Sequence, residues 1–288
     1  MRIIKKAFTL MELIIVIVIM GIVGSIGSEY LAKAYESFIF SKINNTLQEE
    51  SNFATEFIAS RLQYRIKDSI IARKADGTYK ALSDANGDEY IAIEWVQRDI
   101  ESFRGITKPF WSGIIDLDNP RHTSTKLISP ETNTTAINNE IIYYLSYAQN
   151  SIDDGALYFI GANNDIDGYG WDGNAITDQT QVMHPIKAGD EIDEFVANGG
   201  TFSGIDIYEY YLFAWSANAL VLDGEDLYFY YNYQPWQGDQ YSDANRSLVA
   251  SHVKTFRALS VGSVVKVQLC IGTDIIEEYA LCKEKTIF

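Results

Sequence analysis

The sequence predicts an α+β fold: a long N-terminal helix, membrane-spanning in its first half, packs on a head built around an antiparallel β-sheet. Apolar residues recur with helical spacing after the membrane segment, and no proline or glycine lies between Gly27 and Gly77. Farther along, short runs rich in tyrosine and phenylalanine are separated by turn residues, as in antiparallel sheets.

The composition sets limits on size and partners. The chain has 288 residues, of which 47% are hydrophobic and 13% aromatic, enough for one large or two small packed domains. The formal net charge is −16; residues 1–7 hold three basic residues and no acid, so the remainder carries −19. Such a surface repels nucleic acid and anionic lipid. It suits a soluble secreted domain or a calcium-dependent surface.

The first element is an apolar run behind a basic leader. Lys5 and Lys6 precede Ala7-Phe8, and Glu12 is the only charge from there to Gly27. Residues 8–27 would span about 30 Å as a helix, the thickness of a bilayer core. The leader charges predict a cytoplasmic start, with everything after Ser28 on the other side. A secretory signal peptide would end in a small-x-small site, but this run continues into a helical pattern.

This arrangement resembles the N-terminus of type IV prepilins and type II secretion pseudopilins. The resemblance implies that a prepilin peptidase and methyltransferase cuts between Ala7 and Phe8 and N-methylates Phe8. Most members have glycine where this chain has Ala7. Glu12, fifth after the cut, would pair with the Phe8 amine of a neighbouring subunit, because a carboxylate in a membrane needs a partner. The alternative is a signal anchor that tolerates one glutamate.

The same resemblance organises the rest of the chain. It implies a leader at 1–7, a transmembrane half of a spine helix at 8–27, a soluble half at 28–67 and a periplasmic α+β head at 68–288. The whole helix would hold about 60 residues and extend roughly 90 Å. Gly21, Gly24 and Gly27 form a small-residue stripe suited to close helix packing.

Turn and strand signals divide the head. Asp76-Gly77 and Asn86-Gly87-Asp88 predict turns. Residues 105–139, with three of the five prolines, predict a long loop, and 247–255 predict a short connection. Aromatic and β-branched runs predict strands at 141–147, 156–160, 207–215, 226–233 and 264–271, and 275–282 could return as a hairpin partner. Residues 90–98 could be a strand or a helix, although their alternating apolar residues are typical of a half-buried strand. The aromatic cluster at 228–231 fits core packing better than a sugar-binding face.

The C-terminal part suggests a subtype. The segment SLVASHVKTFRALSVGSVVKVQLCI resembles J-type minor pseudopilins loosely. The chain is also longer than most major pilins. Both features favour a minor, tip-located subunit.

Cys270 and Cys282 predict a disulfide, because the head would lie in an oxidising periplasm. Pilins commonly close a C-terminal loop in this way. A tight hairpin turn at 272–274 would instead place the two cysteines about 20 Å apart, beyond bridging distance. The disulfide therefore requires 271–281 to be a loop rather than a hairpin arm.

Two kinds of surface site are further hypotheses. Asn163, Asp165, Asp167 and Asp172 imitate the first half of a calcium loop, although position twelve is Asn174 rather than glutamate. Some minor pseudopilins bind calcium, so Ca²⁺ is the candidate cofactor, but a solvated Asp/Gly turn without a metal is the favoured interpretation. Asn133 and Asn245 fit the acidic-extended bacterial glycosylation sequon in what should be exposed loops.

No enzyme is expected. His122, His184 and His252 are scattered without metal-ligand spacing, and no nucleophile elbow or phosphate loop is present. The sequence thus predicts a single-pass bacterial inner-membrane subunit that assembles into or primes a periplasmic fibre with other pilins. Type II secretion, a surface pilus and DNA uptake are the possible machines. The rival role is an adhesin or receptor pilin whose head binds a ligand.

Overall fold

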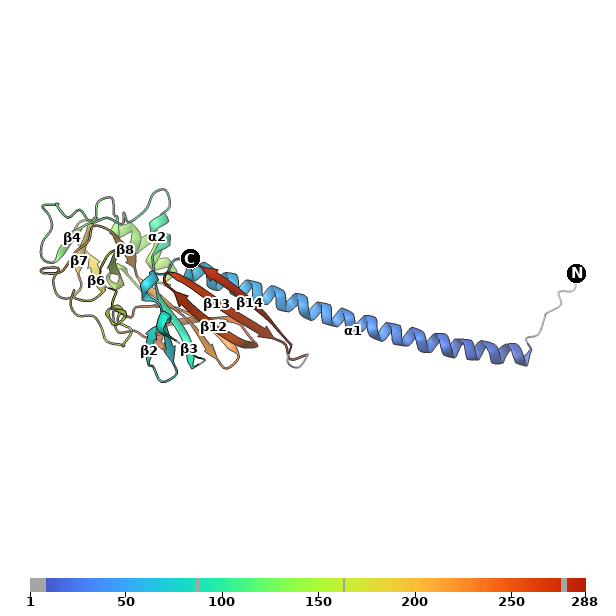
Figure 1. Ribbon diagram of the computed structural model, residues 1–288. Helices are drawn as coiled ribbons and strands as arrows, with labels where there is room; N and C mark the ends of the chain where they lie inside the picture. Colours follow the sequence, from blue (N-terminus) through green and yellow to red (C-terminus); the bar gives the residue numbers. More distant parts are fainter. Residues whose placement is uncertain (1–8, 86, 88, 163, 276–278) are drawn as a thin grey trace, which may run out of the picture. The chain divides into compact units, whose positions relative to one another are not determined.

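The computed structural model describes residues 9–85, 87, 89–162, 164–275 and 279–288 (Figure 1). The chain divides into two compact units, Met1–Glu49 and Glu50–Phe288. Helix α1 (Leu10–Leu62) forms most of the described part of the first unit and opens the second. The predicted α+β architecture, a long apolar helix followed by antiparallel sheets, is confirmed.

Helix α1 ends at Leu62, five residues before the predicted boundary at Lys67. The last turn tightens, with Tyr64 N–H donating to Arg61 O and Arg65 N–H to Leu62 O. Ile66 N–H then donates to the carbonyl of Val96, 2.9 Å away. The chain leaves the helix because these residues pair with a strand of the head.

The central sheet has six strands in the order β11-β10-β9-β3-β1-β2, and every neighbouring pair is antiparallel. Its strands are β1 (Ile71–Lys74), β2 (Tyr79–Ala81), β3 (Tyr90–Gln97), β9 (Ser216–Asp223), β10 (Asp226–Tyr233) and β11 (Asn245–Ala250). The predicted turn at Asp76-Gly77 joins β1 and β2, and Gly77 there has φ of 87°. Of the second predicted turn, Asn86 and Asp88 lie outside the described residues.

Two further antiparallel sheets complete the second unit. The three-stranded sheet, drawn in the orange and red of the chain's end in Figure 1, contains β12 (Val253–Val261), β13 (Val264–Gly272) and β14 (Ala280–Ile287). The five-stranded sheet has the order β4-β7-β6-β5-β8, with β4 (Lys126–Ile128), β5 (Ala156–Phe159), β6 (Met183–Ala188), β7 (Glu194–Ala197) and β8 (Tyr211–Ala214).

Short helices connect the strands. They are η1 (Lys67–Ser69), η2 (Leu82–Asp84), α2 (Ile100–Arg104), α3 (Thr134–Ala136), the π-helix η3 (Ile137–Ile142), α4 (Tyr143–Leu145), η4 (Ile152–Asp154), η5 (Ile166–Tyr169) and η6 (Tyr241–Asp243). The strand predicted at 141–147 is therefore wrong. Asn133 caps a helical run there, and Ile137 and Ile142 are spaced so that both become buried.

The other strand predictions met different outcomes. The strands at 90–98, 156–160, 226–233 and 264–271 are confirmed, within one residue at each end. Only Tyr211–Ala214 of the run at 207–215 is a strand. The connection predicted at 247–255 is wrong, because β11 runs through Ala250 and β12 begins at Val253. The segment 105–139 is mostly irregular, as expected, but it contains β4 and α3.

One face of the central sheet packs against residues 50–62 of α1. Ala54, Ile58 and Leu62 are at most 1% exposed. The Phe57 ring meets Phe229 of β10 edge-on at 5.2 Å, and Lys285 of β14 forms an ion pair with Glu56. This part of the predicted apolar helix face is thus covered by sheet.

The opposite face of the central sheet holds an aromatic core with a buried polar group. Tyr169, Trp171, Tyr233 and Trp236 are at most 1% exposed there. Within this core, Glu94 accepts hydrogen bonds from the Arg73 guanidinium and from the Tyr233 hydroxyl, the latter at 2.8 Å. The residues at 228–231 belong to these layers: Phe229 and Tyr230 are buried, as the core-packing prediction requires.

Candidate assembly site and the other predicted sites

The N-terminus of α1 carries a reciprocal cap between Thr9 and Glu12. The Glu12 backbone N–H donates to Thr9 Oγ1 at 3.3 Å. Glu12 Oε2 accepts from the Thr9 backbone N–H at 3.2 Å and from its hydroxyl at 3.3 Å. This is a capping box, which satisfies helix donors that would otherwise lack partners. The predicted cleavage residues Ala7 and Phe8 lie outside the described residues.

The helix beyond this cap has the composition of a membrane segment. Side chains from Leu13 to Ile26 are exposed, and an 18-residue window of α1 reaches a mean hydropathy of 2.5. Exposed apolar surface of this extent is unfavourable in water, whereas the interior of a bilayer accommodates it. By length and composition α1 can cross a membrane, which fits a membrane-anchored subunit.

Cys270 and Cys282 form a disulfide in the three-stranded sheet. The two residues are direct partners across β13 and β14, with their Cα atoms 4.0 Å apart. The tight turn considered at 272–274 is wrong, because Gly272 pairs with Ala280 and a longer loop joins the strands. The prediction that a disulfide excludes a hairpin arm at 271–281 is therefore wrong, because β13 and β14 form a hairpin that also contains the disulfide.

The acidic loop at 163–172 has its described carboxylates engaged locally. Asp165 caps η5 by accepting from Asp167 N–H at 3.2 Å, and Asp167 accepts from the Tyr79 hydroxyl at 2.9 Å. Asp172 accepts from the backbone and side chain of Asn174. Asn163 lies outside the described residues. Among the residues that are described, no three His, Cys, Asp or Glu side chains gather as metal ligands would. Calcium binding stays a prediction.

The two predicted glycosylation residues are not in exposed loops. Asn133 is half-buried and caps α3, where its Oδ1 accepts from Ala136 N–H at 2.9 Å. Asn245 begins β11, and its amide donates to Gln149 at 3.0 Å. Both side chains therefore already form hydrogen bonds within the fold. Glycosylation of either one stays a prediction.

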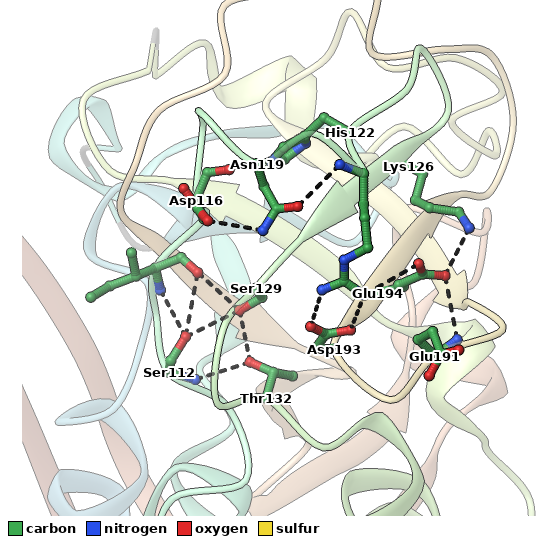
Figure 2. Close-up of polar contacts among 12 residues, drawn as sticks. Ser112, Asp116, Asn119, His122, Lys126, Ser129, Thr132, Glu191, Asp193 and Glu194 are labelled. Carbon is green, nitrogen blue, oxygen red and sulfur yellow. Dashed lines mark hydrogen bonds and ion pairs between the residues drawn. The ribbon is translucent and has the colours of Figure 1, made fainter.

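Figure 2 shows a polar network in the irregular segment that the sequence did not reveal. Ser129 Oγ lies 2.7 Å from Thr132 Oγ1 and 3.1 Å from Ser112 Oγ. Nearby, Lys126 Nζ lies 2.8 Å from Glu194 Oε2, and this contact holds the pKa of the Glu194 carboxyl below its usual value. Within the described residues Ser129 Oγ bonds to other hydroxyl groups and to the carbonyl of Ile114, and none of these is a general base.

The three histidines occupy separate environments. His122 contacts the carbonyl of Asp116, and His252 lies 2.9 Å from Asp274. His184 is buried in β6 against the Phe159 ring. Burial lowers the pKa of His184 to about 4, so its imidazole is neutral at physiological pH.

Comparison with known proteins identified one relationship. Residues 4–28 match the family described as the prokaryotic N-terminal methylation motif. No curated protein and no solved structure matched the chain. The motif is that of precursors processed by prepilin peptidase and assembled with other pilins, a generally structural class. The motif at residues 4–28, together with the long apolar helix and the antiparallel sheets that follow, supports a type IV pilin-like or pseudopilin family for this chain.

Proposed function

We propose that this chain is a minor pilin or pseudopilin subunit that assembles into, or primes, a periplasmic fibre of the type II secretion or type IV pilus kind. Cleavage between Ala7 and Phe8 would free an amine one residue before Thr9. Glu12 would then pair with the methylated Phe8 amine of a neighbouring subunit. The head would lie in the periplasm, with α1 anchoring each subunit in the inner membrane before assembly.

The observation that carries this proposal is the position of Glu12. It is the only charged residue from Phe8 to Gly27, and it lies in the first turn of α1. Within the described residues its carboxylate accepts hydrogen bonds from Thr9, three residues earlier in the chain, at 3.2 and 3.3 Å. A carboxylate inside a bilayer is unfavourable by a few kcal/mol. A cationic amine from a neighbour compensates that penalty better than neutral donors do.

Two features favour a minor subunit. The chain is longer than most major pilins, and a five-stranded sheet with its connecting helices extends the second unit beyond the central sheet. The segment that resembles J-type minor pseudopilins contains β12 and most of β13, and β14 comes after it in the chain. A DNA-uptake role is less favoured, because a net charge of −16 opposes contact with nucleic acid.

The charge of Glu12 is the direct test. Glu12→Gln keeps the size and hydrogen-bonding capacity of the side chain but removes the ion pair. We expect the full-length variant, expressed as the sole copy in its host, to be inserted and processed normally. Its recovery in the sheared fibre fraction should fall about tenfold, as the loss of one favourable charge pair requires.

Glu29→Gln is the matched control. Glu29 also lies on α1 but is paired with Lys33 on its own helix, 2.7 Å away. This variant should enter fibres at the wild-type level. Equal incorporation of Glu12→Gln and wild type would contradict the pairing mechanism.

A further inference from the structure

A cleft of about 350 Å³ opens on the second unit beside the last turns of α1. It lies on the helix-facing side of the central sheet, where β3 ends and β9 begins. This volume falls in the range of small-molecule sites. The lining combines aromatic rings, side-chain amides and guanidinium groups: Phe57, Trp215, Phe229 and Tyr231; Gln97, Asn218 and Asn232; Arg61 and Arg98.

The aromatic side chains form a continuous platform. The rings of Phe229 and Tyr231 stack 5.7 Å apart at an interplanar angle of 18°, and Phe57 meets Phe229 edge-on. Phe57 and Tyr231 are only half-buried, so parts of both rings remain available to a ligand. Aromatic faces of this kind bind the apolar C–H face of a sugar ring.

The two arginines lack acidic partners. The Arg61 guanidinium lies 5.4 Å from the centre of the Phe57 ring, and that of Arg98 lies 5.4 Å from the Phe103 ring. Within the described residues neither forms an ion pair, although acids outnumber basic residues 39 to 23 in the chain. Arg98 Nε is buried and has no hydrogen-bond partner among the described residues, so only the rest of that guanidinium is open to the cleft. Two guanidinium groups in one cleft therefore have donors to offer an anion.

Two acidic residues, Asp99 and Glu101, also line the cleft, but neither forms an ion pair with Arg61 or Arg98 in the part of the chain that the structure describes. Asp99 is 2% exposed and caps α2, where its Oδ1 accepts from Ser102 N–H at 3.0 Å. Glu101 is exposed on the same short helix. The Asp99 side chain is thus too buried to contact a ligand, whereas the Glu101 carboxylate can accept a hydrogen bond from a hydroxyl group of a ligand.

The rim of the cleft holds strained backbone. Asn232 at a bulge of β10 and Tyr147 on the facing loop have positive φ values of 65° and 56°, and Ala148 has 62°. The Asn232 amide donates to the carbonyl of Leu145 at 3.3 Å, which ties the bulge to that loop. Non-glycine residues in this region cost free energy, and such strain concentrates at binding sites. Here it holds Tyr147, which is 75% exposed, at the edge of the cleft.

We propose that this cleft binds a carboxylated oligosaccharide. The Phe57 and Tyr231 rings would stack on sugar rings, Asn232 would orient hydroxyl groups, and Arg61 with Arg98 would bind the carboxylate. The proposal does not depend on the fibre role, because the residues involved are distinct from Glu12.

The test compares two trisaccharides that differ at C6 of each sugar, which is a carboxylate in one and a hydroxymethyl group in the other. Titration calorimetry of the full-length protein in detergent would use trigalacturonic acid and the neutral α-1,4-galactotriose. Charge-assisted hydrogen bonds predict that the acidic sugar binds about tenfold more tightly than the neutral one. Equal affinity for the two, or binding of neither, would overturn the proposal; the latter would leave the cleft to a protein partner.

Matched variants locate the binding site. Arg61→Gln should weaken trigalacturonic acid binding about tenfold. Arg246→Gln is the control, because Arg246 also lies over an aromatic ring, that of Tyr228 at 4.7 Å, but outside the cleft. Tyr147→Gly removes the rim ring while suiting the positive φ, and it should also weaken binding. If Arg61→Gln and Arg246→Gln behave alike, the site is not this cleft.

Discussion

At the scale of single residues, burial of His184 links stability to pH. Its side chain is 3% exposed, and Nδ1 has no hydrogen-bond partner in the described part of the chain. The folded pKa is about 4, against about 6.5 in an unfolded chain. Between these values the unfolded state binds a proton that the folded state refuses. Stability contributed by the neutral imidazole is therefore lost as pH falls from about 6.5 to about 4.

His184→Gln tests this link. The variant should lose the part of the pH dependence that His184 causes, roughly 3 kcal/mol of the unfolding free energy between pH 6.5 and pH 4. The measurement is urea unfolding of the full-length protein at both pH values. His122→Gln, a half-buried histidine on the irregular segment, should keep the wild-type slope. An unchanged slope in His184→Gln would show that this imidazole titrates normally.

Asp99 acts in the opposite direction, so only a difference between variants isolates His184. Burial raises the pKa of Asp99 to about 7, which means that the folded state holds a proton the unfolded state has released. Its protonated form favours folding as pH falls below about 7. Subtracting the variant's curve from that of the wild type removes this shared contribution.

At the scale of elements, the disulfide fixes the hairpin of β13 and β14. Cys270 and Cys282 are twelve residues apart in sequence and face each other across the two strands. Closing a loop of this size restricts the unfolded chain and stabilises the fold by about 3 kcal/mol in the chain-entropy account. The hairpin also carries Lys285, whose ion pair with Glu56 joins β14 to α1.

The double variant Cys270→Ser/Cys282→Ser should therefore lower the unfolding free energy by about 3 kcal/mol. Dithiothreitol should destabilise the wild-type protein by a similar amount and leave the double variant unchanged, as urea unfolding would show. A wild-type midpoint that does not respond to the reductant would mean that the bond contributes nothing to stability.

Strand prediction succeeded where a single pattern dominated. The run of aromatic residues in β10 and the branched residues of β13 were recognised from the sequence. Strand β9 was missed because small residues make it buried on both faces, without alternation. Strand β6 was missed because it contains Pro185, which usually argues against a strand. The carbonyl of Pro185 still accepts two hydrogen bonds, one from the Gln179 side chain and one from the Asn198 backbone N–H, which hold this part of the strand in place.

Site prediction divided in the same way. The N-terminal motif was predictable because processing reads local sequence, and Cys270 with Cys282 were the only cysteines available. The cleft beside α1 was not predictable, because Phe57, Arg98, Tyr147 and Tyr231 come from four distant segments. Only the order of strands in the central sheet brings these segments together.

At the scale of the whole molecule, the chain combines a long apolar helix, proposed to be processed at its start, with an acidic head. Removal of residues 1–7, as proposed, would leave a net charge of −19 and a chain that begins one residue before Thr9. The proposed assembly contact at Glu12 and the proposed cleft both include residues of α1, but these residues lie at opposite ends of the helix. A subunit of this kind can present a binding head without changing the contact that builds the fibre.

The most direct test of the central claim is the mass of the N-terminal peptide of the full-length protein recovered from its host membrane. The account predicts a chain that begins at Phe8 and carries one added methyl group on its amine. A retained leader beginning at Met1, or a cut after the apolar segment near Ser28, would contradict it.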